Sequence, residues 1–517
     1  MKRLYIFLLL FLPLTLAAQT QTTRIEKSMS ILTDVMRQLD MNYFDTLNYD
    51  RMTEEGIRMI LRQVDPYTVY MPKEQDTDLK IMTTGRYGGI GSLIMMRDSM
   101  IYIAETYEGM PAQMGDVRAG DRLIKVDGWK CDGQPTKDVS NRLRGEAGTK
   151  VTLLLEREGE PKPFVRELVR AEIHLPAITY YGRYQDSIAY VLFSEFTTGS
   201  AMALYEAVAQ MAEEHPLSGL IIDLRGNGGG LIDEAIKLVS LFVDKDTEVV
   251  TTKGKVQSSN RSYKTSSSPV YRDLPLVVLV NGSSASASEI VSGSLQDLHR
   301  ATLIGERTFG KGLVQSIRPI VYGGNLKVTT AHYYLPSGRC IQAIDYSARQ
   351  RGEKLQKDTA GGILPDIVIA DSQKVDICYS LAKDHRFYDY ANRYRNTHNA
   401  VARPEEFMLT DEDIEDFMTY LEEKQFVYRT ETSKYLDELS EWVKHEDISA
   451  EALALIDSLQ QQLRPSFTEA ILRHKEEVKW LLGADIIERY YFQKGRAEFL
   501  LRDDKVLKRA IECLQNR

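Results

Sequence analysis

A serine-rich stretch between residues 280 and 295, VNGSSASASEIVSGSL, carries the residue type best suited to nucleophilic catalysis. It holds six serines and begins at the end of the apolar run LPLVVLV. In an α/β fold, reactive groups lie at the carboxyl ends of buried strands, beside helix N-termini that stabilise negative charge. Ser286 could therefore be a nucleophile. A plain helix N-cap is an equally physical interpretation, because a serine oxygen there accepts a backbone N–H.

A serine nucleophile needs a base. Neither His299 nor His332 follows a strand-to-helix turn, so we expect surface or packing roles for both. The serine stretch also lacks the GxSxG pattern of a nucleophile elbow. Lys311, in GERTFGKGLVQ, lies between two glycines after the strand-like run ATLIG. A lysine can act as a general base when burial lowers its pKa toward neutrality, so Lys311 is a candidate base.

Two glycine-rich stretches have further chemical interpretations. GERTFGKG, from Gly305 to Gly312, fits the GxxxxGK part of a phosphate-binding loop. Gly312, however, stands where that loop needs Ser or Thr to hold magnesium, so we disfavour a nucleotide site. DLRGNGGG, from Asp223 to Gly230, follows a second apolar run and could present backbone amides to an oxyanion. A simple turn after a strand would have the same composition.

Composition narrows the classes of protein. The chain has 517 residues, 43% of them hydrophobic, which is enough for packed cores. Its net charge of −9 argues against a general nucleic-acid binder, because phosphate binding needs clustered Lys and Arg. The cysteines show no zinc-binding spacing, so we predict no metal and no cofactor. There are four of them, permitting disulfides without selecting pairs: Cys131, Cys340, Cys378 and Cys513.

The N-terminal residues predict export. MKRLYIFLLLFLPLTLAAQ has a basic start, a long apolar run and small residues at Ala17 and Ala18, which is the order of a secretory signal peptide. The apolar run is short and contains Pro13, so we favour a cleaved peptide over a membrane anchor. We expect cleavage near Ala18 and an exported, periplasmic protein, with membrane association as the alternative.

The pattern of apolar residues divides the rest of the chain into four regions. Residues 19–75 are predicted to be helical, and residues 76–170 alternate short strands with glycine turns, as a small β-rich module does. Residues 171–371 carry continuous apolar runs followed by Gly- or Ser-rich turns and helices, which predicts an α/β domain with buried parallel strands. Residues 372–517 are predicted to be helical again, with a capping signature that begins at Thr410.

Taken together, these stretches resemble the C-terminal processing (tail-specific) serine proteases. The similarity runs from DPY at residue 65 to LPD at residue 366 and rests on FTTGS, DLRGNGGG, SASASEI, GERTFGKGLVQ, YYLPSGR and GGILPD in this order. It implies a multidomain protein with an α/β protease core of the ClpP/crotonase-like fold at 171–371 and an inserted PDZ domain at 76–170. Helical regions would flank them at the N- and C-terminal sides.

The resemblance also assigns catalytic roles. It implies that Ser286 is the nucleophile, that Lys311 is the base, and that Gln315 orients Lys311. The oxyanion hole is implied at two backbone amides, those of Ala287 and of Gly230, with Gly229 as the alternative to Gly230.

In the PDZ-like module, YGGIGS corresponds to the carboxylate-binding loop. Its amides at Ile90, Gly91 and Ser92 would hold a substrate's terminal carboxylate while the substrate adds a strand to the sheet edge. Ser92 departs from the family, which usually has an apolar residue there. The resemblance therefore implies an exported serine endopeptidase that recognises C-terminal tails and cleaves with a Ser–Lys dyad. A catalytically silent PDZ scaffold that binds C-termini is the alternative.

The same resemblance sets the expected partners. These are protein or peptide substrates bound through their C-terminal tails, and no nucleic acid. A homodimer and an adaptor protein are further partners that the resemblance allows. For the helical region 372–517, a structural buttress and a dimer surface are the two interpretations that stay open.

Overall fold

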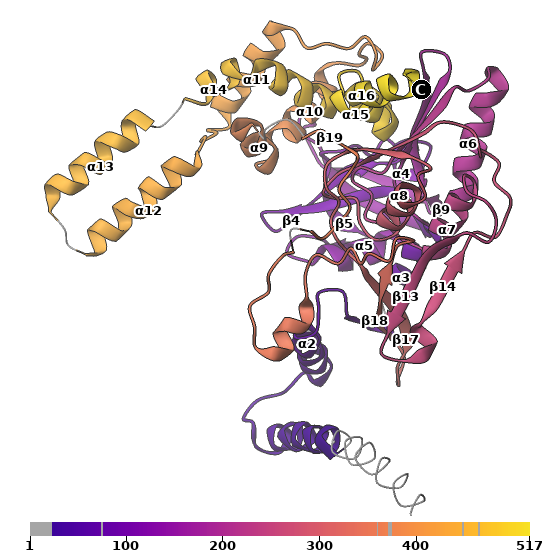
Figure 1. Cartoon of the computed structure of the whole chain (residues 1–517). Coiled ribbons are helices and arrows are strands. Elements are labelled where there is room, and N and C mark those ends of the chain that lie inside the picture. Colours follow the sequence, from indigo (N-terminus) through magenta and orange to yellow (C-terminus); the bar gives the residue numbers. More distant parts are fainter. Residues whose placement is uncertain are drawn as a thin grey trace, which may run out of the picture. The chain divides into compact units, whose positions relative to one another are not determined.

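The structure is a computed structural model of the whole chain (Figure 1), described for residues 23–73, 76–358, 360–370, 375–446, 449–463 and 466–516. The predicted signal peptide lies outside these residues. The chain divides into two compact units, Met1–Tyr70 and Met71–Arg517. Among the described residues, no helix is both long enough and apolar enough to cross a bilayer.

The first unit is helical, as its apolar spacing predicts. One helix is described from residue 23 to residue 42, and α2 spans Tyr49–Arg62. The side chain of Asn48 caps α2 by accepting a hydrogen bond from the Arg51 N–H at 2.9 Å. The apolar stripe of the first helix is exposed at Met29, Leu32 and Val35.

The β-rich module is built on one main sheet of order β3-β4-β5-β7-β8, with β6 paired to β5 and a separate β2–β9 pair. Its elements are α3 (Asp76–Thr84), β2 (Arg86–Gly89), β3 (Ser92–Arg97), β4 (Met100–Thr106), α4 (Pro111–Met114), β5 (Arg122–Val126), β6 (Trp129–Lys130), α5 (Thr136–Leu143), β7 (Lys150–Glu156), β8 (Phe164–Val169) and β9 (Ala171–His174). Helix α5 buries Val139 and Leu143. Strand β3 is an edge strand, since no other described strand pairs with its outer side.

The α/β domain contains a six-stranded sheet of order β10-β11-β12-β15-β16-β19. Its elements are β10 (Ile178–Tyr184), β11 (Ile188–Phe193), α6 (Ser200–Glu214), β12 (Gly219–Asp223), α7 (Ile232–Ser240), β15 (Leu276–Val280), α8 (Ala287–Asp297), β16 (Thr302–Gly305) and β19 (Ile367–Val368). Only β10 is antiparallel to its neighbour. Every residue of β12 and β15 is buried, which confirms the prediction of buried parallel strands.

Different helices cover the two faces of this sheet. Successive residues of a strand point to opposite faces. Val191 of β11 belongs to the apolar cluster that includes α6, α7 and α8. Its neighbour Tyr190 belongs to a second cluster, which includes Leu507 and Leu514 of α16 (Lys505–Gln515). The sheet is therefore completed by a helix from the C-terminal helical region.

A second, antiparallel sheet lies in the same domain. Strand β18 (Asn325–Tyr334) pairs with β17 (Leu313–Pro319) on one side and β13 (Glu248–Gly254) on the other, and β13 pairs with β14 (Arg261–Lys264). Strands β13 and β14 form a hairpin that spans residues 248–264. The remaining short elements are β1 (Val69–Met71) and the 3-10 helices Gln257–Ser259 and Tyr346–Arg351.

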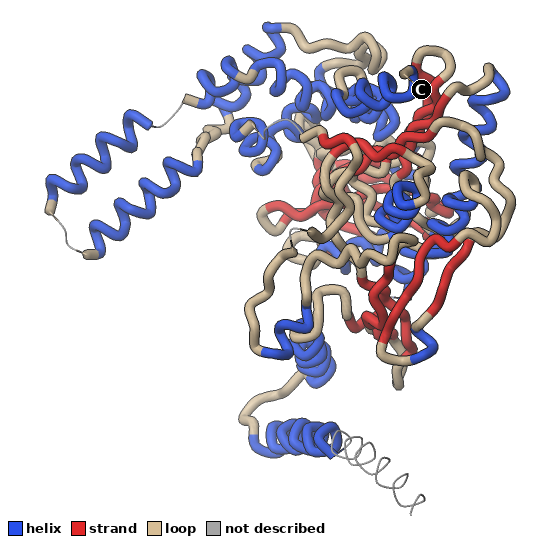
Figure 2. Tube along the Cα trace, in the orientation of Figure 1, coloured by secondary structure: helices blue, strands red, loops and turns tan. Residues whose placement is uncertain are grey.

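From residue 375 onward the described chain consists of helices and loops (Figure 2). The helices are α9 (Asp376–Lys383), α10 (Arg386–Thr397), α11 (Asp411–Glu423), α12 (Glu431–His445), α13 (Ala450–Leu463), α14 (Phe467–Arg473), α15 (Lys475–Leu501) and α16. The capping signature is confirmed, because the Thr410 N–H donates to Asp413 Oδ2 at 2.7 Å and Thr410 Oγ1 accepts from the Asp413 N–H at 3.2 Å. Helices α12 and α13 lie side by side as a hairpin (Figure 1).

Truncating the α16 contact should weaken the fold. Leu507 is 2% exposed in the cluster that covers the sheet, so Leu507→Ala should cost about 2–5 kcal/mol through lost burial and the cavity left behind. We expect a lower urea midpoint when unfolding is followed by circular dichroism. The matched control is Leu455→Ala on α13, where the side chain is 68% exposed and the expected change is within about 0.5 kcal/mol. Equal midpoints for the two variants would contradict the packing of α16 on the sheet.

Candidate active site

Ser286 lies in the turn between β15 and α8 and is the N-cap residue of that helix. Its backbone has φ 58° and ψ −114°, which a side-chain-bearing residue adopts at a cost of about 1–3 kcal/mol. Such strain is concentrated at functional sites, where the surrounding structure enforces it. Ser286 also lines a cavity of about 540 Å³. The N-cap interpretation and the reactive one therefore apply to the same residue.

The cavity gathers residues from three separate stretches of the sequence. The predicted site residues that line it are Ser286, Lys311, Gln315, Gly229 and Gly230. Ala287 follows Ser286 directly and is buried as the first residue of α8. The structure thus brings the serine stretch, the FGKG stretch and the NGGG loop together at the carboxyl ends of β12, β15 and β16.

The glycine loop approaches the serine turn too closely for any side chain. A Cβ at Gly229 would lie 2.8 Å from Ser286 Cβ and 2.9 Å from the Ala287 nitrogen, and its φ of +100° also favours glycine. The Gly229 N–H donates to Asn227 Oδ1 at 2.8 Å, and Asn227 Nδ2 donates to the Phe193 carbonyl at 2.7 Å. Asn227 therefore fixes the loop to the end of β11.

One carboxylate joins the serine turn to the lysine loop. Glu289 Oε2 accepts the N–H groups of Ser286 at 3.0 Å and Lys311 at 2.9 Å. Its Oε1 accepts the Thr308 hydroxyl at 2.6 Å and the Gly310 N–H at 2.8 Å. The side chain is fully buried, and burial raises the pKa of Glu289, while the four donors oppose that shift.

Glu289 was not among the residues that the sequence pointed to. Its signal was present all the same, because a Glu three residues after an N-cap Ser is the capping-box pattern. What the pattern could not reveal is that the same carboxylate also reaches the Lys311 loop.

Tyr333 of β18 makes a second bridge between the same two loops. Its hydroxyl, buried at the cavity wall, donates to the Ser286 carbonyl at 3.2 Å and also contacts the Lys311 carbonyl. A hydroxyl has a single hydrogen, so the two carbonyls share this donor. Glu289 thus accepts the backbone N–H groups of Ser286 and Lys311, and Tyr333 donates to their backbone carbonyls. Both side chains hold the same two residues in place.

Two further polar side chains line the cavity. The Gln315 amide donates to the Leu313 carbonyl at 3.3 Å and to Thr329 Oγ1 at 3.4 Å, which orients it along the β17–β18 pair. Lys327 of β18 is a second cavity lysine that the sequence did not single out, and burial lowers its pKa. Within the described residues, no group of His, Cys, Asp and Glu side chains is arranged to hold a metal ion.

The predicted carboxylate loop lies at the start of the edge strand β3. Its carbonyls are used internally, since the Ile90 carbonyl accepts from Ala112 at 2.8 Å and the Gly91 carbonyl accepts from Tyr107 at 3.0 Å. The hydroxyl of Ser92 is buried, and no partner for it is found among the described residues. The loop therefore lies beside a sheet edge that no described strand covers, with the Ser92 hydroxyl buried behind it.

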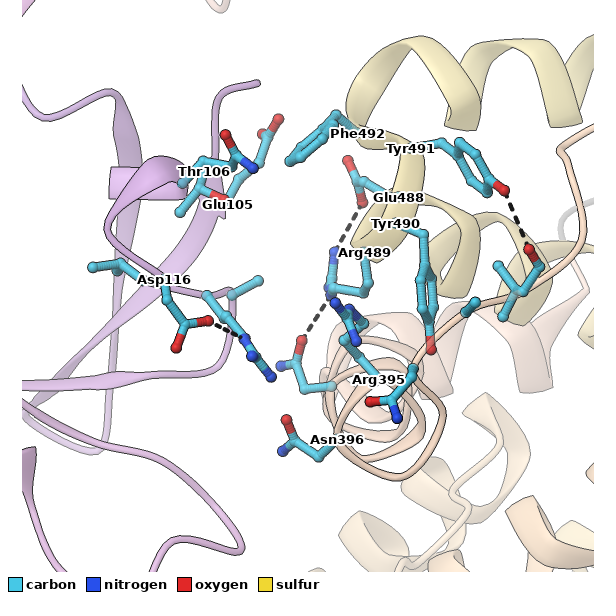
Figure 3. Close-up of a pocket in the computed structure, with 18 residues that line it drawn as sticks. Glu105, Thr106, Asp116, Arg395, Asn396, Glu488, Arg489, Tyr490, Tyr491 and Phe492 are labelled. Atoms are coloured by element: carbon cyan, nitrogen blue, oxygen red, sulfur yellow. Dashed lines mark hydrogen bonds and ion pairs between the residues drawn. The ribbon is translucent and has the colours of Figure 1, made fainter. Parts of the chain in front are cut away.

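The β-rich module is attached to the C-terminal helices. The Tyr388 hydroxyl accepts from the Gly120 N–H at 2.7 Å and donates to the Ile103 carbonyl at 2.5 Å, and Arg97 pairs with Asp389 at 2.8 Å. A cavity of about 380 Å³ lies beside this contact. Figure 3 shows Glu105 among its lining residues, and Glu105 Oε2 accepts from Gln493 Nε2 of α15 at 3.0 Å. Within α15 the helical backbone is interrupted at Phe492, with φ 56° and ψ −162°.

Comparisons with known proteins identify the family. Residues 187–369 match "Peptidase family S41", residues 102–157 match "PDZ domain", and residues 377–514 match "Probable PDZ-protease, C-terminal helical domain". A carboxy-terminal-processing protease of Bartonella bacilliformis is 35% identical over 363 residues, which cover 69% of this chain and 79% of that protein. The chain belongs to the carboxy-terminal-processing protease family. It is a serine-type peptidase with an S41 core, a PDZ domain and a helical C-terminal region.

Other relatives are similar over smaller shares. A "Probable CtpA-like serine protease" of Staphylococcus aureus is 31% identical over 322 residues, 61% of this chain and 63% of that protein. The solved structure of a photosystem II D1 C-terminal processing protease is 26% identical, with a TM-score of 0.38, covering 63% of this chain and 84% of that one. The PDZ domain of a carboxy-terminal protease from Vibrio cholerae, solved with a peptide, is 33% identical over 17% of this chain and 99% of its own length, with a TM-score of 0.17.

Replacing Glu289 by Gln should uncouple the two loops. An amide offers one acceptor oxygen where the carboxylate offers two, and its NH₂ would face two N–H or O–H donors. Hydrogen bonds to a charged group contribute about 1.5–3 kcal/mol each, so we expect peptidase kcat/KM on an unfolded protein to fall at least tenfold, about 1.4 kcal/mol. Steady-state kinetics measure the loss, and circular dichroism checks that the variant is folded.

The control for Glu289→Gln is Glu206→Gln on the exposed side of α6, for which no change is expected. Unchanged kcat/KM in a folded Glu289→Gln variant would show that the carboxylate does not align the site.

Proposed function

We propose that this protein is an exported endopeptidase that recognises substrate C-terminal tails through its PDZ domain and cleaves them with a Ser286–Lys311 dyad. The observation that carries the proposal is that both residues line one cavity and that Glu289 accepts the backbone N–H of each. A buried carboxylate costs free energy unless hydrogen bonds compensate it, and the four donors of Glu289 come from the serine turn and the lysine loop. It is well suited to a site where two groups must stay aligned.

In the proposed reaction, neutral Lys311 accepts the proton of Ser286 while Oγ attacks the scissile carbonyl carbon. Gln315 orients Lys311. The carbonyl oxygen becomes an oxyanion, collapse of the adduct breaks the C–N bond, and Lys311 returns the proton to the leaving amine. Water then hydrolyses the acyl-enzyme and regenerates Ser286. No metal or cofactor takes part.

The proposed oxyanion donors are the backbone N–H groups of Gly230 and Ala287. The Gly229 N–H is already bonded to Asn227, which favours Gly230 over its neighbour. Ala287 begins α8, so its N–H belongs to the helix N-terminus, where the helix dipole also favours an anion. Each such donor is worth about 2.7–4 kcal/mol to the transition state.

For tail recognition, we propose that a substrate C-terminus adds a strand along β3 and places its carboxylate at the amides of Ile90, Gly91 and Ser92. The unpaired outer edge of β3 supports this, since an open edge supplies the backbone groups that strand addition needs. The exposed apolar side chains of Leu93 and Met96 on this strand suit an apolar tail.

For the core, we propose the ClpP/crotonase-like fold, which the parallel order β11-β12-β15-β16 with helices on both faces supports. A homodimer and an adaptor protein are the further proposed partners.

For the location, we propose export to the periplasm, which the basic, apolar and small-residue segments that end near Ala18 support. Fractionation of cells that produce the full chain tests the location, with a mature N-terminus near Ala18 as the expected result.

The dyad is tested by substitution. Ser286→Ala and Lys311→Ala should each abolish cleavage of an unfolded reporter with an apolar C-terminus, while wild type cuts it, because each removes one partner of the proton transfer. Mass spectrometry detects the fragments and maps the bond. Cleavage by either variant at the wild-type rate would remove that residue from the chemistry. A wild type that binds the reporter without cutting it would favour the silent PDZ scaffold.

Tail recognition is tested by changing one atom group of the substrate. Converting the reporter's C-terminal carboxylate to an amide removes the negative charge that the loop amides would hold, so kcat/KM should fall about tenfold. A matched reporter with a Gly appended after the same sequence keeps the carboxylate and tests the effect of length alone. Equal kcat/KM for the acid and the amide would count against carboxylate recognition.

A further inference from the structure

A buried charge network ties the glycine loop to the C-terminal helical region. Arg225 immediately precedes the loop 226–230, and its Nη2 donates to Asp504 Oδ2 at 2.5 Å. Both side chains are largely buried, with exposed fractions of 22% for Arg225 and 13% for Asp504. Asp504 belongs to the connection between α15 and α16, far along the sequence from the strand it reaches.

Arg225 also faces a second carboxylate, that of Asp223 at the end of β12. Its Nε and Nη2 donate to Asp223 Oδ2 at 3.0 and 2.5 Å, and Asp223 is 1% exposed. The Tyr190 hydroxyl donates to the same oxygen at 2.7 Å. The Arg225 guanidinium thus lies between two buried carboxylates, those of Asp223 and Asp504. Removing the charge of either one would favour a different position of the guanidinium.

The two oxygens of Asp504 make separate contacts. Oδ1 accepts the N–H groups of Val506 at 2.8 Å and Leu507 at 3.0 Å, which caps α16. Oδ2 accepts the hydrogen bond from Arg225 Nη2. The position of Arg225 is therefore linked to a helix that is itself anchored on the face of the sheet by apolar packing.

Packing alone does not fix the Arg225 side chain. A cavity of about 360 Å³ is lined by Asp223, Arg225, Gly226 and Asp504. An arginine beside such a space can adopt other rotamers unless charged partners hold it. The loop that follows begins at Gly226, whose N–H donates to Asn281 Oδ1 at 3.1 Å, and Asn227 anchors its middle. Arg225 is therefore the charged contact at the start of a loop that is otherwise held by neutral hydrogen bonds.

We propose that Asp504 is a positioning residue for the peptidase reaction. Through Arg225 it holds the loop 226–230 so that the Gly230 N–H points at the oxyanion, and the C-terminal helical region thereby completes the active site. This inference rests on the proposed function, because it assigns Asp504 a role in the oxyanion geometry of that same site. It predicts that the region matters for turnover as well as for stability.

The variant Asp504→Asn separates the two contacts. Asn is as good an N-cap as Asp, so α16 keeps its cap, whereas the charge that faces Arg225 is lost. We expect kcat on the unfolded reporter to fall about 10- to 100-fold, since small displacements of catalytic donors cost factors of this size. KM should change less than about threefold, and Asp504→Glu, which keeps the charge, should recover part of kcat. Asp503→Asn is the matched control, because Asp503 is exposed and pairs with Lys508.

Circular dichroism and thermal unfolding check that each variant is folded. Asp504→Ser, which also caps a helix but carries no charge, replaces Asp504→Asn if that variant does not fold. A drop in kcat for the uncharged variant alone supports the inference. Wild-type kcat in a folded, uncharged variant overturns it and leaves the dyad untouched. If wild type itself does not cleave, the proposed function falls and this inference falls with it.

Discussion

The site depends on one buried carboxylate. Glu289 belongs to the helix that Ser286 caps, yet it accepts backbone donors from the loop that carries Lys311. Only an ionised carboxylate has the acceptor capacity for all four of its donors, and it can hold that charge in a buried place only while the donors stay where they are. The Glu289 carboxylate therefore fixes the strained serine turn and the lysine loop relative to one another.

Local patterns predicted much of this architecture because their causes are local. The runs GLII and LVVLV are apolar throughout since both faces of those strands are covered, and the structure places them as neighbouring parallel strands. The glycines of the NGGG loop were informative because close backbone approach excludes side chains, as Gly229 shows against Ser286. The resemblance added the pairing of Ser286 with Lys311, which stays a prediction for two residues that line one cavity.

The residues that the sequence missed act across long separations. Glu289 looks like a cap, Tyr333 like a strand residue and Asp504 like the start of one more helix. Each acquires its further contact only when the chain folds back on itself, and no periodicity records such a contact. The packing of the C-terminal helical region could not be predicted for the same reason. Apolar spacing indicates that α16 has a buried face, but it does not indicate that this face packs on the protease sheet.

The packing of α16 has a consequence for biosynthesis. The face of the central sheet that contains Tyr190, Ile221 and Val277 is covered by Leu501, Leu507 and Leu514, which are made long after those strands. While the chain is still growing on the ribosome, this face has no cover and the sheet cannot exclude water on both sides. A nascent chain therefore remains short of its final core until these residues emerge.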